Sequence, residues 1–234
     1  MEKNTNLSGF LLINKPSGPT SHDIIDQLRK ITGIAKIGHA GTLDPFASGL
    51  LICAVGRATT KKLSVLVKLD KEYEAVFYLG AATDTYDHSG KITSRYQGRP
   101  LEPATVSQVL AEFVGAQNQI PPMFSAKKVG GHKLYDLARA GQTVERQPAA
   151  ITIYNLELLN YAWPHLCLRI NCSSGTYIRS LAFDLGERLG CGAYVEELQR
   201  TAIGKYNLES AVNLEQLSRD NWQRYLAQLV TRNV

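Results

Sequence analysis

The order of apolar and polar residues predicts that the chain begins with a buried strand followed by a helix. Residues 9–14 (GFLLIN) form an apolar run, which the polar stretch KPSGPTSHD then ends. A helix is expected over residues 22–32, because apolar residues recur there at three- and four-residue spacing. Thr20 or Ser21 can cap its start, and Gly33 ends it. The apolar positions of this helix are Ile24, Ile25, Leu28 and Ile31.

The rest of the chain continues with a mixture of short strands and helices. Strands are expected where β-branched and aromatic residues cluster, and helices where apolar residues follow helical spacing. The expected strands are 49–55, 71–80, 149–160, 165–172 and the second half of 193–206. The expected helices are 57–67, 103–114, one within 173–190 that Gly190 ends, and a short tail at about 213–231. Because the two types alternate irregularly, we expect an α+β fold with a mixed, mainly antiparallel sheet flanked by helices.

Composition places the chain among soluble globular proteins of one large or two small domains. The 234 residues are 44% hydrophobic and 20% charged. No segment reaches the roughly 18 apolar residues of a membrane-spanning helix, and the N-terminal segment lacks a signal-peptide core. The four cysteines have no CxxC spacing, which favours free thiols in the cytoplasm and disfavours a zinc site. Because P-loop, GxGxxG and GxSxG patterns are missing, nucleotide cofactors and serine hydrolysis have no support.

The net charge is +5, and part of the excess lies in residues 127–148. This segment is either a solvated face or a surface for an anionic partner, and charge alone does not separate the two. Its basic residues are Lys127, Lys128, Lys133, Arg139 and Arg146, set against Asp136 and Glu145.

The stretch GHAGTLDPFASGLL (residues 38–51) is unusual because polar and glycine residues directly precede an apolar run. Asp44 lies before Pro45, which disfavours helical dihedral angles at Asp44. The carboxylate therefore either stabilises an ordinary turn or is presented for chemistry. His39 allows the same two interpretations, a structural histidine or a group that contacts a ligand.

A second polar group, Tyr177 with Arg179, lies in SSGTYIRSLAFDLG, where a loop is expected to become a helix. Burial raises the pKa of an aspartate, whereas a neighbouring arginine lowers it. A buried catalytic aspartate therefore requires an arginine beside it. We predict that Asp44 and Arg179 meet.

Five motifs in order over residues 9–204 resemble the bacterial tRNA pseudouridine-55 synthases of the TruB type. They read LLINKPSGPTSHD, KIGHAGTLDPFASGLLICAVGRATT, KEYEAVFYLGAATDTYDHSG, IPPMFSAKKVGGHKLYDLARAG, and SSGTYIRSLAFDLG with LQRTAIG. The resemblance implies the pseudouridine synthase fold and an isomerase that acts on one uridine in the T loop of tRNA. The glycosidic bond is cut, the base turns, and C5 is joined to C1′.

The resemblance also assigns roles to single residues. Asp44 is the essential carboxylate, which either attacks C1′ or removes the C2′ proton, and Arg179 keeps it ionised. The residues expected to contact the flipped nucleotide are His39, Tyr73 (stacking), Tyr177 and Leu198 (apolar floor). Lys15 is counted with these substrate-binding residues and is expected to support its motif or to contact the RNA backbone. The residues expected to contact the RNA backbone are Lys127, Lys128, Lys133 and Arg139.

Domain boundaries and partners follow from the same resemblance. Residues 1–204 are expected to form the catalytic domain, with 119–148 as an RNA-clamping insertion. Residues 205–234 are too short for the PUA-type RNA-binding domain of longer family members. We expect the T arm of tRNA as partner, a monomer without an obligatory protein partner, no membrane association, and no cofactor or metal. A non-catalytic or guide-dependent RNA-binding relative of the same fold is the alternative.

Overall fold

The computed structural model describes residues 7–125, 127–142 and 144–227, except for the side chains at 128, 129, 132 and 133. The chain divides into two compact units. Unit 1 combines the chain up to Tyr73 with the chain from Leu198 onward, and unit 2 is Glu74–Glu197. Strands β4 (Lys71–Leu79) and β12 (Ala193–Ile203) each contribute to both units.

Unit 1 is built on strands in the order β14–β1–β3–β12, with β2 also paired to β3 and β13 to β12. Strand β1 runs antiparallel to β3 and parallel to β14, whereas β3 and β12 run parallel to each other. Its other elements are β1 Gly9–Lys15, α1 Ser21–Thr32, β2 Ile37–His39, β3 Ser48–Val55, α2 Arg57–Thr60, α3 Leu63–Val67, β13 Tyr206–Asn207, β14 Val212–Asn213, and the 3-10 turns η1 Leu208–Ser210, η2 Leu214–Gln216 and η3 Trp222–Tyr225.

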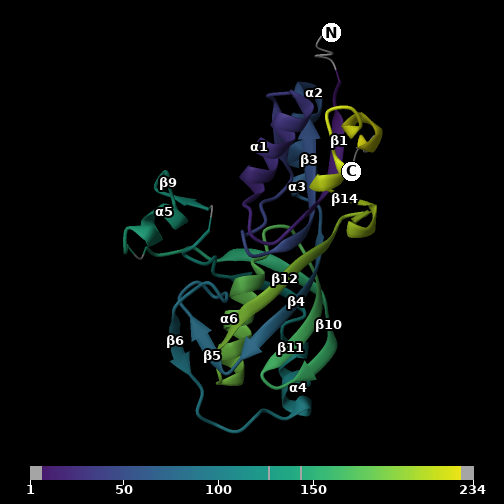
Figure 1. Cartoon of the computed structure of the whole chain (residues 1–234). Helices are drawn as coiled ribbons and strands as arrows, with labels where there is room; N and C mark the ends of the chain where they lie inside the picture. Colours follow the sequence, from purple (N-terminus) through teal and green to yellow (C-terminus); the bar gives the residue numbers. More distant parts are fainter. Residues whose placement is uncertain (1–6, 126, 143, 228–234) are drawn as a thin grey trace. The chain divides into compact units, whose positions relative to one another are not determined.

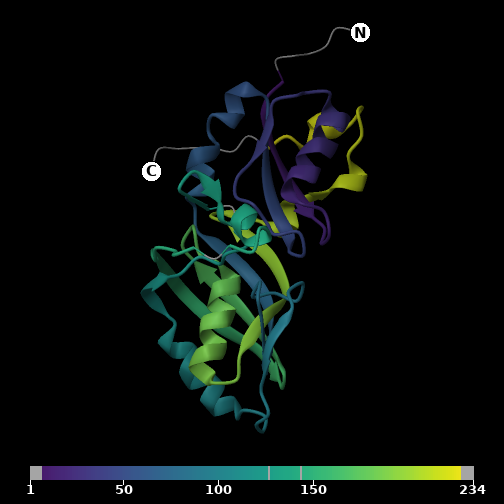
Figure 2. The same cartoon turned by 90° about the vertical axis from the view of Figure 1, so that its left-hand side faces the viewer.

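The central strands of unit 1 are apolar on both faces because helices cover both (Figure 2). Helix α1 packs on one face, and α3 packs on the other. Alternate residues of β1 therefore enter different cores, as expected for side chains of period two. The first core contains Leu11, Ile13, Ile24, Ile25, Leu28, Leu51 and Cys53, and the second contains Phe10, Leu12, Leu50, Ile52 and Leu66.

The predicted strand at 9–14 and the predicted helix at 22–32 are confirmed. Thr20 caps α1 by accepting a hydrogen bond from the Asp23 amide, and Gly33 ends the helix in the left-handed conformation at φ 70°. The helix predicted over 57–67 is interrupted and forms α2 and α3 instead.

The predicted helical tail is wrong over the described residues 213–227, which form β14, two 3-10 turns and extended segments. The apolar residues of this segment are buried in the core that α1 and β1 share, and such tertiary contacts override the local preference for a helix. The buried residues of the segment are Leu214, Leu217 and Trp222, and Val212 directly before it belongs to the same core.

Unit 2 is a sheet with the strand order β4–β11–β10–β7, and β12 lies beside β4 (Figure 1). Helices α4 and α6 contact each other and cover one of its faces. Its remaining elements are β5 Ala81–Thr83, β6 Ile92–Arg95, α4 Pro103–Glu112, β7 Gly115–Gln119, β8 Lys128–Val129, β9 His132–Lys133, α5 Leu134–Arg139, β10 Ala149–Ala162, β11 His165–Cys172 and α6 Ile178–Leu189. The predicted α+β class with a mainly antiparallel sheet is confirmed.

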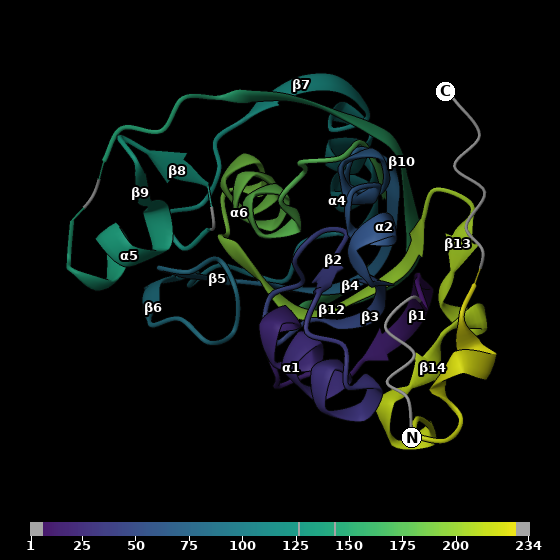
Figure 3. The same cartoon turned by 90° about the horizontal axis from the view of Figure 1, so that it is seen from above.

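The segment between β7 and β10 stands apart from the sheet of unit 2 (Figure 3). Strands β8 and β9 pair as an antiparallel hairpin, whose turn residues Gly130 and Gly131 both have positive φ. Helix α5 follows the hairpin directly. Among the described helices of both units, none has the length and apolar character needed to cross a membrane.

Helix α6 carries a half-buried acid, Asp184, which we expect to destabilise the fold at neutral pH. Burial, with a smaller contribution from Glu187, raises the pKa of Asp184 from 3.8 to about 6. The folded state therefore binds more protons than the unfolded state between these values, so stability falls as pH rises through that range. Asp184→Asn should raise the free energy of unfolding at pH 7 by about 1 kcal/mol, after allowance for partial exposure.

Urea unfolding at pH 7 and pH 4 measures this effect. Most of the gain should disappear at pH 4, where the wild-type carboxyl is largely protonated in the folded state. Glu187→Gln, on the exposed side of the same helix, should give a smaller gain at pH 7. An equal gain at both pH values would contradict the assignment.

Candidate active site

The backbone of the turn that carries Asp44 is held by serine side chains at the start of α1 and in the segment before it. Ser21 is buried, and its hydroxyl both donates to the Leu43 carbonyl at 3.1 Å and accepts from the Leu43 amide at 2.9 Å. Ser17 donates to the Phe46 carbonyl at 2.7 Å. The residues on either side of the carboxylate are therefore fixed, while Asp44 itself is half-buried.

Lys15, the last residue of β1, supports the same turn from inside the protein. Its side chain is fully buried, and its ammonium group donates to the carbonyls of Pro16 and Pro19 at 2.8 Å and of Pro45 at 3.2 Å. Burial lowers the pKa of Lys15 to about 8, against the opposing attraction of Asp44. The two charges therefore lie within electrostatic reach of each other, and the lysine stabilises the ionised carboxylate.

Arg200 of β12 joins the two ends of the turn. This arginine is 1% exposed, and its guanidinium donates to the Leu50 carbonyl at 2.8 Å and to the Gly41 carbonyl at 3.0 Å. Glycine is required at position 49, because a Cβ there would lie 2.3 Å from the Arg200 carbonyl oxygen. The buried guanidinium of Arg200 thus connects the residues before and after the turn.

His39 ends β2, directly before this turn. Burial, with a contribution from the positive charge of Arg200, lowers the pKa of His39, which favours the neutral ring. Its Nδ1 is buried without a hydrogen-bond partner among the described residues. A neutral imidazole can contact a ligand without contributing charge.

Arg179 lies in the first turn of α6 and is 4% exposed. Its guanidinium donates to the carbonyls of Thr85 at 3.1 Å and Phe124 at 2.7 Å. Asp87 faces it at 3.5 Å and is also buried. The direction of the guanidinium is therefore set by three groups from two loops.

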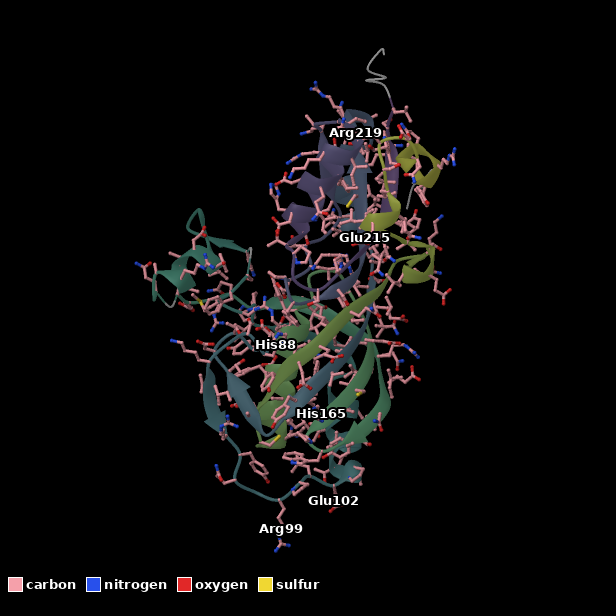
Figure 4. The ribbon with its side chains drawn as sticks, viewed as in Figure 1. His88, Arg99, Glu102, His165, Glu215 and Arg219 are labelled. Carbon is pink, nitrogen blue, oxygen red and sulfur yellow. The ribbon has the colours of Figure 1, made fainter. Side chains whose placement is uncertain are left out.

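The carboxylate of Asp87 is itself organised. Its Oδ1 accepts hydrogen bonds from the Thr85 hydroxyl and from both the amide and the hydroxyl of Ser89, which leaves Oδ2 toward Arg179. His88, the next residue, is labelled in Figure 4 and anchors this loop to β12 through its Nδ1 at 2.8 Å from the Glu196 carbonyl. The loop thus presents one carboxylate oxygen in a fixed position.

The predicted nucleotide-contacting residues are distributed over both units. Tyr73 and Leu198 are largely buried in unit 1, at the positions where β4 and β12 change units. Tyr177 is half-buried and caps the start of α6 in unit 2. Asp44 belongs to unit 1 and Arg179 to unit 2, so their predicted pairing stays a prediction.

The predicted backbone-contacting residues belong to the segment that stands apart from the sheet. Lys127 donates weakly to the Gln147 carbonyl at 3.4 Å. Arg139 is exposed and stacks its guanidinium 4.6 Å from the centre of the Tyr135 ring. The side chains of Lys128 and Lys133 lie outside the described part of the structure.

Sequence reasoning did not single out Asp87, Gln119 or Arg200. Asp87 lies in a loop whose Gly, Asp, Ser and Thr content marked it as a connection, and several polar residues there were equally plausible. Gln119 ends a short strand and gives no chemical signal. No group of histidines, cysteines or acids that could hold a metal ion occurs among the residues with described positions.

Comparison with known proteins gives matches over nearly the whole chain. Residues 29–178 match the family described as TruB family pseudouridylate synthase (N terminal domain). Residues 179–232 match the tRNA pseudouridylate synthase B C-terminal domain.

Curated relatives and a solved structure agree with these family matches. The tRNA pseudouridine synthase B of Protochlamydia amoebophila is 51% identical over 210 residues, which cover 89% of this chain and 79% of that protein. The Geobacter sulfurreducens protein of the same name is 46% identical over 90% of this chain and 69% of its own length. A structure of an H/ACA RNP bound to a substrate RNA containing 2′-deoxyuridine is similar with a TM-score of 0.68 and 28% identity, over 92% of this chain. This chain spans 53% of the length of that solved chain.

Proposed function

The chain belongs to the TruB family of pseudouridylate synthases, and from this premise we propose that it converts uridine 55 in the T loop of tRNA to pseudouridine. The observation that carries the proposal is the 51% identity to a tRNA pseudouridine synthase B over 89% of the chain. The reaction is an isomerisation, because the uracil leaves C1′ through N1 and returns to it through C5 with no atom gained or lost.

In this proposal Asp44 is the catalytic carboxylate, whether it attacks C1′ or removes the C2′ proton. Either role requires the ionised form, which Lys15 supports electrostatically. The contacts of Ser21, Lys15 and Arg200 all reach backbone carbonyls of the turn, so they hold its shape without using the carboxylate. A carboxylate on a rigid support is suited to a reaction that depends on position.

Arg179 is proposed to act as the cation that faces the reacting carboxylate and the nucleotide. Asp87 and two carbonyls already orient its guanidinium, so little reorganisation is needed when substrate binds. His39, Tyr177 and Leu198 are proposed to contact the displaced base.

Recognition of tRNA is proposed to use the segment between β7 and β10 as an RNA clamp, with the T arm as its target. Lys127, Lys128, Lys133 and Arg139 would contact phosphates, so affinity should fall as salt rises. We also propose that residues 1–204 form the catalytic domain, with 205–234 as a C-terminal segment. The enzyme is proposed to act as a cytoplasmic monomer.

Incubating the purified protein with a T-arm stem-loop tritiated at C5 of uridine tests the proposal. Joining C5 to C1′ displaces the C5 hydrogen, so tritium should enter water in step with pseudouridine formation. No other RNA is added, because a guide-dependent relative would then stay inactive. A non-catalytic RNA-binding protein would bind the stem-loop without release, and a hydrolase would release free uracil.

Tyr73 is expected to stack on the flipped uracil, and stacking of this kind contributes about 1–3 kcal/mol. Tyr73→Ala should therefore lower turnover about 10- to 100-fold. Tyr73→Phe keeps the ring and should stay close to wild type. Tyr78→Ala removes a different ring of β4, which is stacked on Tyr194 at 5.0 Å, and serves as the control.

Turnover on the stem-loop and the thermal midpoint are measured together for these variants. If Tyr73→Ala folds as stably as the control and still turns over at the wild-type rate, the Tyr73 ring does not stack on the substrate.

A further inference from the structure

Gln119 occupies the junction where β7 ends and the RNA clamp begins, and it is 3% exposed. Its carboxamide makes two hydrogen bonds with the backbone of one residue, Tyr177. Its Nε2 donates to the Tyr177 carbonyl at 3.0 Å, and its Oε1 accepts from the Tyr177 amide at 2.8 Å. The side chain therefore pairs with Tyr177 as the backbone of a neighbouring strand would.

Two further hydrogen bonds connect the same two segments. The Ser180 hydroxyl donates to the Ile120 carbonyl at 2.8 Å, and the Arg179 guanidinium donates to the Phe124 carbonyl at 2.7 Å. Residues 119–124, at the base of the clamp, are thus joined to the first turn of α6. Tyr177 caps that turn without a side-chain cap of its own, so Gln119 takes over part of the capping role.

We propose that Gln119 is a positioning residue for the pseudouridine synthase reaction. It acts through the Tyr177 backbone to set the first turn of α6, and thereby the place of Arg179, relative to the base of the RNA clamp. This proposal rests on the proposed function. The direction of the Arg179 guanidinium is set by Asp87, Thr85 and Phe124, whereas the position of the Arg179 backbone is set by Gln119.

Loss of the Gln119 carboxamide should disturb the geometry of the site more than the stability of the fold. The two hydrogen bonds make only a modest net contribution to folding, which a well-packed unit tolerates losing. A shift of about 1 Å in a group that acts on the reacting atoms costs about 100-fold in rate. Loss of the carboxamide should therefore reduce the chemical rate far more than it reduces stability or RNA affinity.

The test compares Gln119→Leu and Gln119→Glu with wild type in single-turnover reactions at saturating tRNA. Both variants should lower the rate constant about 10- to 100-fold at pH 8, while the tRNA dissociation constant stays within about threefold of wild type. A matched control is Gln117→Leu, two residues earlier in β7, where the wild-type side chain donates to the Phe113 carbonyl at 2.6 Å. This control should behave like wild type.

The rate of the Gln119→Glu variant should depend on pH in a way that a general loss of stability would not produce. Its ionised carboxylate can still accept from the Tyr177 amide but repels the Tyr177 carbonyl. Protonation restores a donor, so its rate relative to wild type should rise as pH falls from 8 to about 5.5, because burial raises the pKa of such a group. Gln119→Leu, with nothing to protonate, should show no such rise. A flat ratio for both variants would overturn the proposal.

Two other results would also overturn it. Wild-type rate constants in both variants would remove the positioning role, and a weaker tRNA affinity with an unchanged rate would assign the contact to RNA binding alone. Hydrogen exchange of the Tyr177 amide, measured without RNA, should be faster in Gln119→Leu than in wild type or Gln117→Leu. That measurement needs no turnover, so it tests the contact between Gln119 and Tyr177 even if the wild-type protein makes no pseudouridine. A wild-type protein that makes no pseudouridine would refute the proposed function and not this contact.

Discussion

Replacing Asp44 with asparagine should abolish pseudouridine formation, with a loss of about 10⁴-fold or more. An amide can neither attack C1′ nor accept a proton from C2′, so both possible roles are lost at once. The turn should persist, because the contacts of Ser21 and Lys15 reach its backbone carbonyls. The measurement is tritium release from the C5-labelled stem-loop, together with the tRNA dissociation constant and the thermal midpoint.

Asp26→Asn is the matched control, because Asp26 is a carboxylate of the same unit that pairs with Arg29 on the surface of α1. It should release tritium at the wild-type rate. Equal release by Asp44→Asn and wild type would remove Asp44 from the chemistry and leave the proposed mechanism without its central group.

Arg179→Met should lower turnover about 10²- to 10³-fold, the range expected when one preorganised electrostatic contact is removed. It should also destabilise unit 2 by about 3 kcal/mol, because Asp87 is left as a buried carboxylate without its cation. Turnover and urea unfolding are measured on the same preparations.

The double variant Arg179→Met with Asp87→Asn separates the two effects. Removing both charges should recover most of the lost stability, because no unpaired charge remains buried. Turnover should stay as low as in the single variant. Recovery of turnover along with stability would mean that Arg179 supports the fold and takes no part in catalysis.

Much of the fold could be predicted from local pattern. The sequence predicts helix α1 with Thr20 or Ser21 as its cap and Gly33 at its end, because capping and apolar spacing are local properties, and the structure has Thr20 as the cap. The strands β1, β3 and β4 were equally predictable. The errors arose where burial by distant segments overrode local preference, as around Trp222, where the described tail packs on α1 instead of forming a helix.

The candidate site divides in the same way. Asp44, Tyr177 and Arg179 stand in motifs whose spelling and order identify the family, so sequence sufficed to name them. Asp87 and Gln119 became visible only through their partners, since Arg179 follows Asp87 by 92 positions and Tyr177 follows Gln119 by 58. An aspartate in a polar loop and a glutamine at a strand end carry no signal of their own.

The sequence by itself determined the family, the α+β class and the carboxylate on its glycine-flanked turn, because these depend on residue identity, order and short-range spacing. Only the tertiary structure decided which buried groups contact each other around the candidate residues: Lys15 and Arg200 with backbone carbonyls of the turn, Asp87 with Arg179, and Gln119 with Tyr177. The physical reason is that a buried charge or amide must find its partner wherever the fold brings one, and such pairings leave no periodicity along the chain.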